Sequence, residues 1–175
     1  MISSIAVAAG VDDARRWFTA SSFPGFHSTT EPVTPVDREL LDLFADHDLD
    51  LKSARTVVDT HGRRLAIASS ASGEICYSAA IEGKAVFGAC FHQYQKTGLT
   101  VGHLSGGTNR PAEVFGLISE GTSDIVITTS DGVSHHPDAA NSAFWWTAPS
   151  VAAVESITAT KNGKRVVDES SFRTK

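Results

Sequence analysis

Cysteine, methionine and proline are scarce in this chain, with 2, 1 and 6 copies respectively among 175 residues. No apolar run approaches the roughly 20 residues that a membrane-spanning helix needs, so no transmembrane segment is expected. Neither an HExxH motif nor a paired CxxC motif occurs, which removes the usual zinc signatures. A chain of this length buries a core of its own, so folding does not require a metal or a disulfide framework.

Positive charge is sparse as well. Lysine and arginine number 15 against 20 aspartates and glutamates, which gives a formal net charge of -5, and no Lys/Arg block occurs. Nucleic acid and anionic membrane surfaces are therefore poor partners, because little in the chain would neutralise phosphates. No phosphate loop, dinucleotide fingerprint or kinase motif is found, and we expect no cofactor.

Helical periodicity is confined to the first 50 residues. Thr34 provides an N-cap and Pro35 the first helical position, so the pattern predicts a helix that continues to about Asp46. A less regular pattern predicts a second helix from Val11 to about Ala20. The uncharged, apolar residues 1–11 have two interpretations: the remnant of a trimmed signal or anchor, which implies anchoring through a missing N-terminal segment, or an ordinary N-terminal strand or helix start.

From about Leu51 onward, short runs of β-branched and aromatic residues alternate with Gly-containing turns, as is typical of an all-β sandwich or barrel. Asp-Gly and Asn-Gly pairs favour tight type I′ hairpins. The sequence therefore predicts that 125–129 pairs with 133–136, and that 157–161 pairs with 164–167. Four turns carry this pattern: His61-Gly62, Glu82-Gly83, Asp131-Gly132 and Asn162-Gly163.

These patterns predict one domain over residues 1–175. We expect a mainly β (α+β) fold, an antiparallel hairpin-rich sandwich or open barrel. The helical and loop segment 1–50, with one or two helices, would pack on a β core formed by 51–175.

The two cysteines lie on either side of the Glu82-Gly83 turn. If residues 82–84 form a three-residue loop, Cys76 stands directly opposite Cys90, and Ile81 stands opposite Ala85. One hairpin face is then wholly apolar. Opposed cysteines on antiparallel strands approach within the separation that a disulfide needs, so we expect a Cys76–Cys90 disulfide. The alternative is a pair of buried, reduced thiols in a cytosolic protein.

Histidines provide the candidate metal ligands of the chain. His135, His136 and Asp138 lie close together in the sequence, with His103 contributed from another strand. Adjacent histidines on a strand point to opposite faces, so His135 and His136 share an ion only if the strand ends there. This set, with Ser105, defines the alternative of a hydrolytic or metal-dependent enzyme, although no catalytic motif supports a catalytic residue.

Two adjacent tryptophans are the candidate binding residues. On a strand, Trp145 faces away from Phe144 and Trp146, so one face places a large aromatic side chain at the surface unless both faces are covered. We single out Trp145 and Trp146 because an exposed aromatic side chain often marks a binding site.

Four motifs are shared with a known group of domains: Gly73-Glu74-Ile75-Cys76, Gly88-Ala89-Cys90, Val114-Phe115-Gly116-Leu117-Ile118-Ser119-Glu120-Gly121, and Asp131-Gly132 followed by Asn141-Ser142-Ala143-Phe144. Through these motifs, the segment from about Lys52 to Lys164 resembles uncharacterised extracytoplasmic β domains of secreted or membrane-anchored actinobacterial proteins. The resemblance implies a disulfide-bearing β domain in the cell envelope, and it transfers no catalytic residues. We therefore expect a non-enzymatic interaction or sensory module that binds a protein or small ligand, the alternatives being the enzyme above and a structural envelope or phage-type component.

Overall fold

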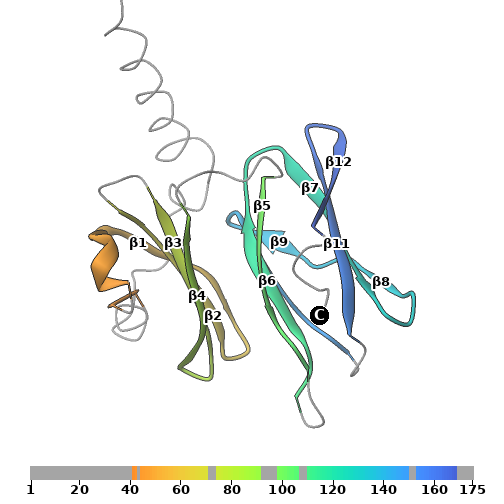
Figure 1. The fold of residues 1–175 in the computed structure, drawn as a ribbon, viewed down its shortest axis with the longest axis horizontal. Coiled ribbons are helices and arrows are strands. Elements are labelled where there is room, and N and C mark those ends of the chain that lie inside the picture. Colours follow the sequence, from red (N-terminus) through yellow and green to blue (C-terminus); the bar gives the residue numbers. More distant parts are fainter. Residues whose placement is uncertain are drawn as a thin grey trace, which may run out of the picture. The chain divides into compact units, whose positions relative to one another are not determined.

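The computed structural model describes residues 41–42, 44–70, 74–91, 98–106, 110–149 and 153–168. These residues form three antiparallel four-stranded sheets, none of which closes into a barrel (Figure 1). The mainly β fold is thus confirmed. The helix from Val11 to about Ala20 and most of the helix from Pro35 lie outside the described residues, and no described helix is long and apolar enough to cross a membrane.

The chain divides into two compact units, Met1–Tyr94 and Gln95–Lys175. We refer to them as the first and the second unit. The expectation of a single domain stays a prediction.

The first unit contains one sheet in which the strand order follows the sequence, β1-β2-β3-β4. Its turns His61-Gly62 and Glu82-Gly83 have positive φ at both residues, as a type I′ turn requires. Its elements are the 3-10 helix η3 (Ala45–His47) and the strands β1 (Leu49–Thr60), β2 (Arg63–Ser70), β3 (Ile75–Ile81) and β4 (Lys84–Phe91).

The β3–β4 hairpin has the predicted register at the cysteines but a different turn. Cys76 pairs with Cys90, as predicted, whereas Ile81 pairs with Lys84 rather than with Ala85. The three-residue loop was therefore wrong. A two-residue turn closes the hairpin, and an irregularity beside Ala79 shifts the register by one residue. From Ala79 to Ile75 the pairing is therefore the one that a three-residue loop would give.

The second unit contains two sheets, in the orders β5-β6-β10-β9 and β12-β11-β7-β8. The first four of its strands in sequence are β5 (Leu99–Leu104), β6 (Glu113–Ile118), β7 (Thr122–Thr129) and β8 (Ser134–His135). The remaining four are β9 (Ala139–Ala140), β10 (Ala143–Thr147), β11 (Val154–Lys161) and β12 (Lys164–Asp168).

Both predicted hairpins of the second unit are present. In β7–β8, Ile127 pairs with His135, and in β11–β12, Lys161 pairs with Lys164 around a tight Asn162-Gly163 turn. The Asp131-Gly132 turn differs from the type I′ expectation. Only its glycine has positive φ, because the loop contains one residue more than a type I′ turn, and the Thr129 N–H donates to the Val133 carbonyl across it.

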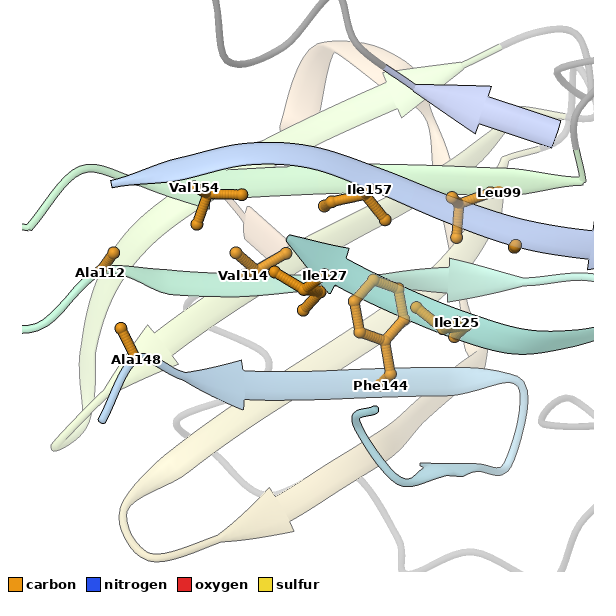
Figure 2. Packing of buried hydrophobic residues seen from close by; sticks show 10 residues of the cluster. Leu99, Ala112, Val114, Ile125, Ile127, Phe144, Ala148, Val154 and Ile157 are labelled. Atoms are coloured by element: carbon orange, nitrogen blue, oxygen red, sulfur yellow. The ribbon is translucent and has the colours of Figure 1, made fainter. Parts of the chain in front are cut away.

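One hydrophobic core joins the two sheets of the second unit (Figure 2). Val114 and Phe144 come from one sheet, and Ile127 and Ile157 from the other, and all four side chains are fully buried. Gly116 lets Phe144 and the neighbouring backbone approach, since a Cβ there would overlap the Thr100 carbonyl oxygen. Alternate residues of β10 therefore contribute to this core, and the side chains between them point to the opposite face of the sheet.

Candidate functional site

Trp145 lies on the face of its sheet opposite to the core of the second unit. Phe144 belongs to that core and Trp146 packs against it, so the alternation of β10 turns Trp145 to the other side. Both tryptophans are half-buried. Of the two candidate binding residues, Trp146 is thus used in packing, and Trp145 is the one directed away from the core.

The Trp145 ring is fixed by two neighbours on β6. It stacks on Phe115, with ring centroids 4.6 Å apart and planes inclined by 27°. Its indole Nε1 donates a hydrogen bond of 2.7 Å to Glu113 Oε2, which also accepts from the Thr147 hydroxyl at 2.7 Å. Gly102 on β5 leaves room for the Phe115 ring, because a Cβ there would overlap it. A carboxylate that is only 2% exposed is thus held by two donors, and it orients the tryptophan.

The residues predicted for a metal site lie on separate elements. His103 is on β5, His135 on β8, and His136 and Asp138 in the connection from β8 to β9. Within the described residues, the side chains that gather as three possible metal ligands are a different set, His47, Cys76 and Cys90. The exposed Ser105 follows β5 in the chain. Metal binding by the predicted set stays a prediction.

Two of these histidines have defined surroundings. The His135 ring lies 4.9 Å from that of Trp146, centroid to centroid, and its Nε2 is 3.4 Å from the Thr129 hydroxyl oxygen. Burial lowers the pKa of His103, because desolvation disfavours the imidazolium form. The side chains of His135 and His103 are thus partly buried within the second unit.

Asp131 closes the β7–β8 loop. The Thr129 hydroxyl and the Val133 backbone N–H both donate to its Oδ1, at 2.5 and 3.2 Å. The hydroxyl, the backbone N–H and, to a smaller extent, the charge of His135 lower the pKa of this carboxyl. The carboxylate therefore stabilises the turn through these two hydrogen bonds.

Cys76 and Cys90 form the expected disulfide, with their Cα atoms 4.0 Å apart. They lie on a sheet face made of small residues, which we call the small-residue face: Ala66, Ala68, Cys76, Ser78, Gly88 and Cys90. Leu41 and Phe44 cover part of this face, as Leu41 packs with Ala68 and the Phe44 ring occupies the space above Gly88. Small side chains are thus what lets Leu41 and Phe44 approach the sheet.

His47 and Glu74 border the disulfide. The ligand atoms of His47, Cys76 and Cys90 all lie within 4.8 Å of one another. His47 Nδ1 is 3.0 Å from Glu74 Oε2, and the side chain of Glu74 is 8% exposed against 39% for His47. The Phe44 ring meets the His47 ring edge to face, with centroids 6.1 Å apart.

Sequence reasoning missed four residues that matter here: Glu113, Phe115, His47 and Glu74. Glu113 and Phe115 reach Trp145 through the pairing of β6 with β10, which no local pattern of the sequence predicts. Nothing in the local pattern connects His47 with residues 27 positions or more along the chain.

Comparisons of the chain with protein-family models, with curated proteins and with solved structures found no match.

Proposed function

We propose that this protein is a non-enzymatic, extracytoplasmic interaction module that binds a protein or small ligand through the exposed part of the Trp145 side chain. We further propose that the second unit is a β-sandwich that holds this side chain rigid. The observation that carries the proposal is the fixed orientation of Trp145, stacked on Phe115 and hydrogen-bonded to Glu113.

A fixed aromatic side chain suits binding for an energetic reason. Ordering a free side chain on association costs about 0.5–1.5 kcal/mol, and a ring that is already oriented avoids that cost. Tryptophan also offers a large apolar area together with a polar N–H, which is why it is enriched at binding sites. Half-burial of Trp145 leaves part of its surface for a ligand.

The disulfide supports the proposed location. Disulfides persist in oxidising compartments and are rare in the cytosol of most organisms. Both cysteines of the chain are in the Cys76–Cys90 bond. The acidic net charge of -5 further supports partners other than nucleic acid.

The location proposal is tested by the oxidation state of the protein isolated from its source. We expect an intact mass two protons below that of the dithiol, and no alkylation after unfolding without reductant. Two alkylated thiols would overturn the extracytoplasmic part of the proposal.

The binding proposal is tested with protein labelled with 5-fluorotryptophan. The chain has three tryptophans, Trp17, Trp145 and Trp146, so single Trp-to-Phe variants assign three fluorine NMR signals. The probes are oligomers of N-acetylglucosamine, which stand for a small ligand, and a casein peptide mixture, which stands for a protein. We expect a probe to shift the Trp145 signal and leave the Trp146 signal in place.

A Trp145 signal that responds to neither probe and is shielded from a soluble paramagnetic quencher would contradict the proposal. Equal shifts of the Trp145 and Trp146 signals would contradict it too, since they would indicate a change in folding. Phe115→Leu should weaken the response of Trp145 by removing the ring that supports it.

A further inference from the structure

The small-residue face carries a set of metal-ligand side chains that the interaction module does not use. His47 comes from the end of η3, Cys76 from β3 and Cys90 from β4. Their ligand atoms lie within 4.8 Å of one another. Two thiolates and an imidazole on neighbouring elements are a ligand set that suits Zn²⁺, which binds sulfur at about 2.3 Å and nitrogen at about 2.0–2.1 Å.

The contact between His47 and Glu74 resembles the outer shell of a zinc site. Metal-binding histidines usually donate their second ring N–H to a carboxylate, which fixes the tautomer and the ring orientation. His47 Nδ1 faces Glu74 Oε2 at 3.0 Å. With Nδ1 engaged in this way, Nε2 is the nitrogen left for a metal.

We propose that Cys76, Cys90 and His47 form a zinc site that becomes available when the disulfide is reduced. In the oxidised chain both sulfurs are bonded to each other, so the pair cannot provide thiolates. The site therefore has two states, a closed disulfide and an open dithiolate. The proposal is independent of ligand binding at Trp145.

The reducing step requires a dithiol reductant, in the chemical class of dithiol proteins or dithiothreitol. Cys76 is fully buried and Cys90 is half-buried, so attack occurs at the Cys90 sulfur. A bond forms between the reductant and Cys90, and Cys76 leaves as a thiolate. The second thiol of the reductant then displaces Cys90 and becomes part of a disulfide. Zn²⁺ binding to the two thiols releases two protons.

The geometry needs only a local adjustment on reduction. The strands already place the two Cα atoms 4.0 Å apart, and rotation of the two cysteine side chains separates the sulfurs to the spacing of tetrahedral ligands. Three protein ligands leave the fourth position for water. Phe44 lies against His47 and over Gly88, so it shields one side of the site.

The test uses the full chain and Co²⁺, which reports tetrahedral thiolate coordination through its visible and near-ultraviolet absorption. After reduction with a phosphine, we expect one equivalent of Co²⁺ to bind, with a sulfur-to-cobalt charge-transfer band, and Zn²⁺ to displace it. The oxidised chain should give no such band. A reduced chain without the band, or equal binding by the oxidised chain, would overturn the proposal.

Variants separate this site from adventitious thiol binding. His47→Ala should weaken Co²⁺ binding at least as much as the 10- to 100-fold typical of outer-shell changes, and Glu74→Gln should weaken it by about tenfold. His61→Asn, at an exposed histidine in the β1–β2 turn, is the matched control and should leave binding unchanged, because asparagine tolerates the positive φ of this position. Unchanged binding in His47→Ala would contradict the proposal.

Reduction itself can unfold the hairpin, so folding is followed by circular dichroism in the same samples. If the reduced chain loses its β signal, we expect Zn²⁺ to restore the signal in the wild type and not in His47→Ala. Failure of Zn²⁺ to restore it, or equal restoration in both, would overturn the proposal.

Discussion

The first unit pairs strands that are consecutive in the sequence, whereas the second unit also pairs strands that lie far apart in it. In the first, four consecutive strands form one sheet, and a disulfide joins two neighbours, β3 and β4. In the second, β6 pairs with β10 and β7 with β11, and no cysteine is present. Residues from both of its sheets meet in one hydrophobic cluster.

This difference determines which substitutions should destabilise each unit. A local sheet with a covalent bond should depend on that bond and on the residues that cover part of its small-residue face. A core formed by strands far apart in the sequence should depend on close approach between side chains and backbone, because a packed interior tolerates little change in volume.

The largest expected effect comes from glycine-to-alanine substitutions at matched positions in the two units. A Cβ at Gly116 overlaps the backbone oxygen of Thr100, while a Cβ at Gly88 overlaps the far edge of the Phe44 ring. Backbone in a sheet cannot move aside, but a ring can. We expect Gly116→Ala to lower the free energy of unfolding by about 3 kcal/mol or more, and Gly88→Ala by about 1 kcal/mol. Urea denaturation measures both.

A double-mutant cycle tests the reason for this difference. Phe44→Leu should recover most of the loss in Gly88→Ala, since it removes the atoms that the new methyl group meets. Gly163→Ala is the control for backbone strain without a steric clash. An alanine Cβ at this position meets no atom, but the φ of 76° still disfavours alanine. A Gly88→Ala variant as unstable as Gly116→Ala would remove the contrast between the units.

Removal of the disulfide should weaken the first unit alone. Cys76→Ala/Cys90→Ala opens a loop of 14 residues in sequence separation, which corresponds to a loss of about 2–3 kcal/mol. Hydrogen exchange should increase in β3 and β4 and stay unchanged in β7 and β11. Equal acceleration in both units would show that they unfold together, as the prediction of one domain implies.

The same contrast explains how much the sequence could predict. Turn residues fix the register of consecutive strands, so the hairpins β3–β4, β7–β8 and β11–β12 and the disulfide were predictable. The type of each turn and the number of residues in it could not be predicted. A tight turn followed by a bulge and a three-residue loop give the same register at Cys76, and they differ in the pairing of Ile81, which is with Lys84 in the structure.

The candidate sites depend on pairings that no local pattern determines. Glu113 meets Trp145 across 32 residues, because β6 and β10 are neighbours in a sheet whose order does not follow the sequence. His47 reaches the disulfide because Leu41 and Phe44 pack on the small-residue face. Such contacts follow from the packing of the whole unit, so the sequence predicted Trp145 and the disulfide but neither of their partners.

A moderate effect is expected at the Glu113–Trp145 hydrogen bond. Trp145→Phe keeps an aromatic ring against Phe115 but removes the donor to a buried carboxylate, which should cost about 1.5–3 kcal/mol. Thr147→Val removes the other donor to the same oxygen and provides the comparison. Thermal denaturation of the two single variants and the double variant measures the coupling. A fully neutral Trp145→Phe would mean that the hydrogen bond does not hold the ring.

The smallest expected effect is a dependence of the second unit on pH through His103. Burial lowers the pKa of His103 in the folded chain below the ordinary value of about 6.5. The unfolded chain therefore binds more protons than the folded chain in the window below pH 6.5, and stability falls as the pH drops through that window.

His103→Asn should reduce the difference in melting temperature between pH 7.5 and pH 5.5, whereas His136→Asn, at an exposed position, is the control. The reduction should appear in the exchange of β5 and not in that of β3, since His103 belongs to the core-facing side of the second unit. An unchanged pH dependence in His103→Asn would mean that the proton taken up on unfolding goes to another group.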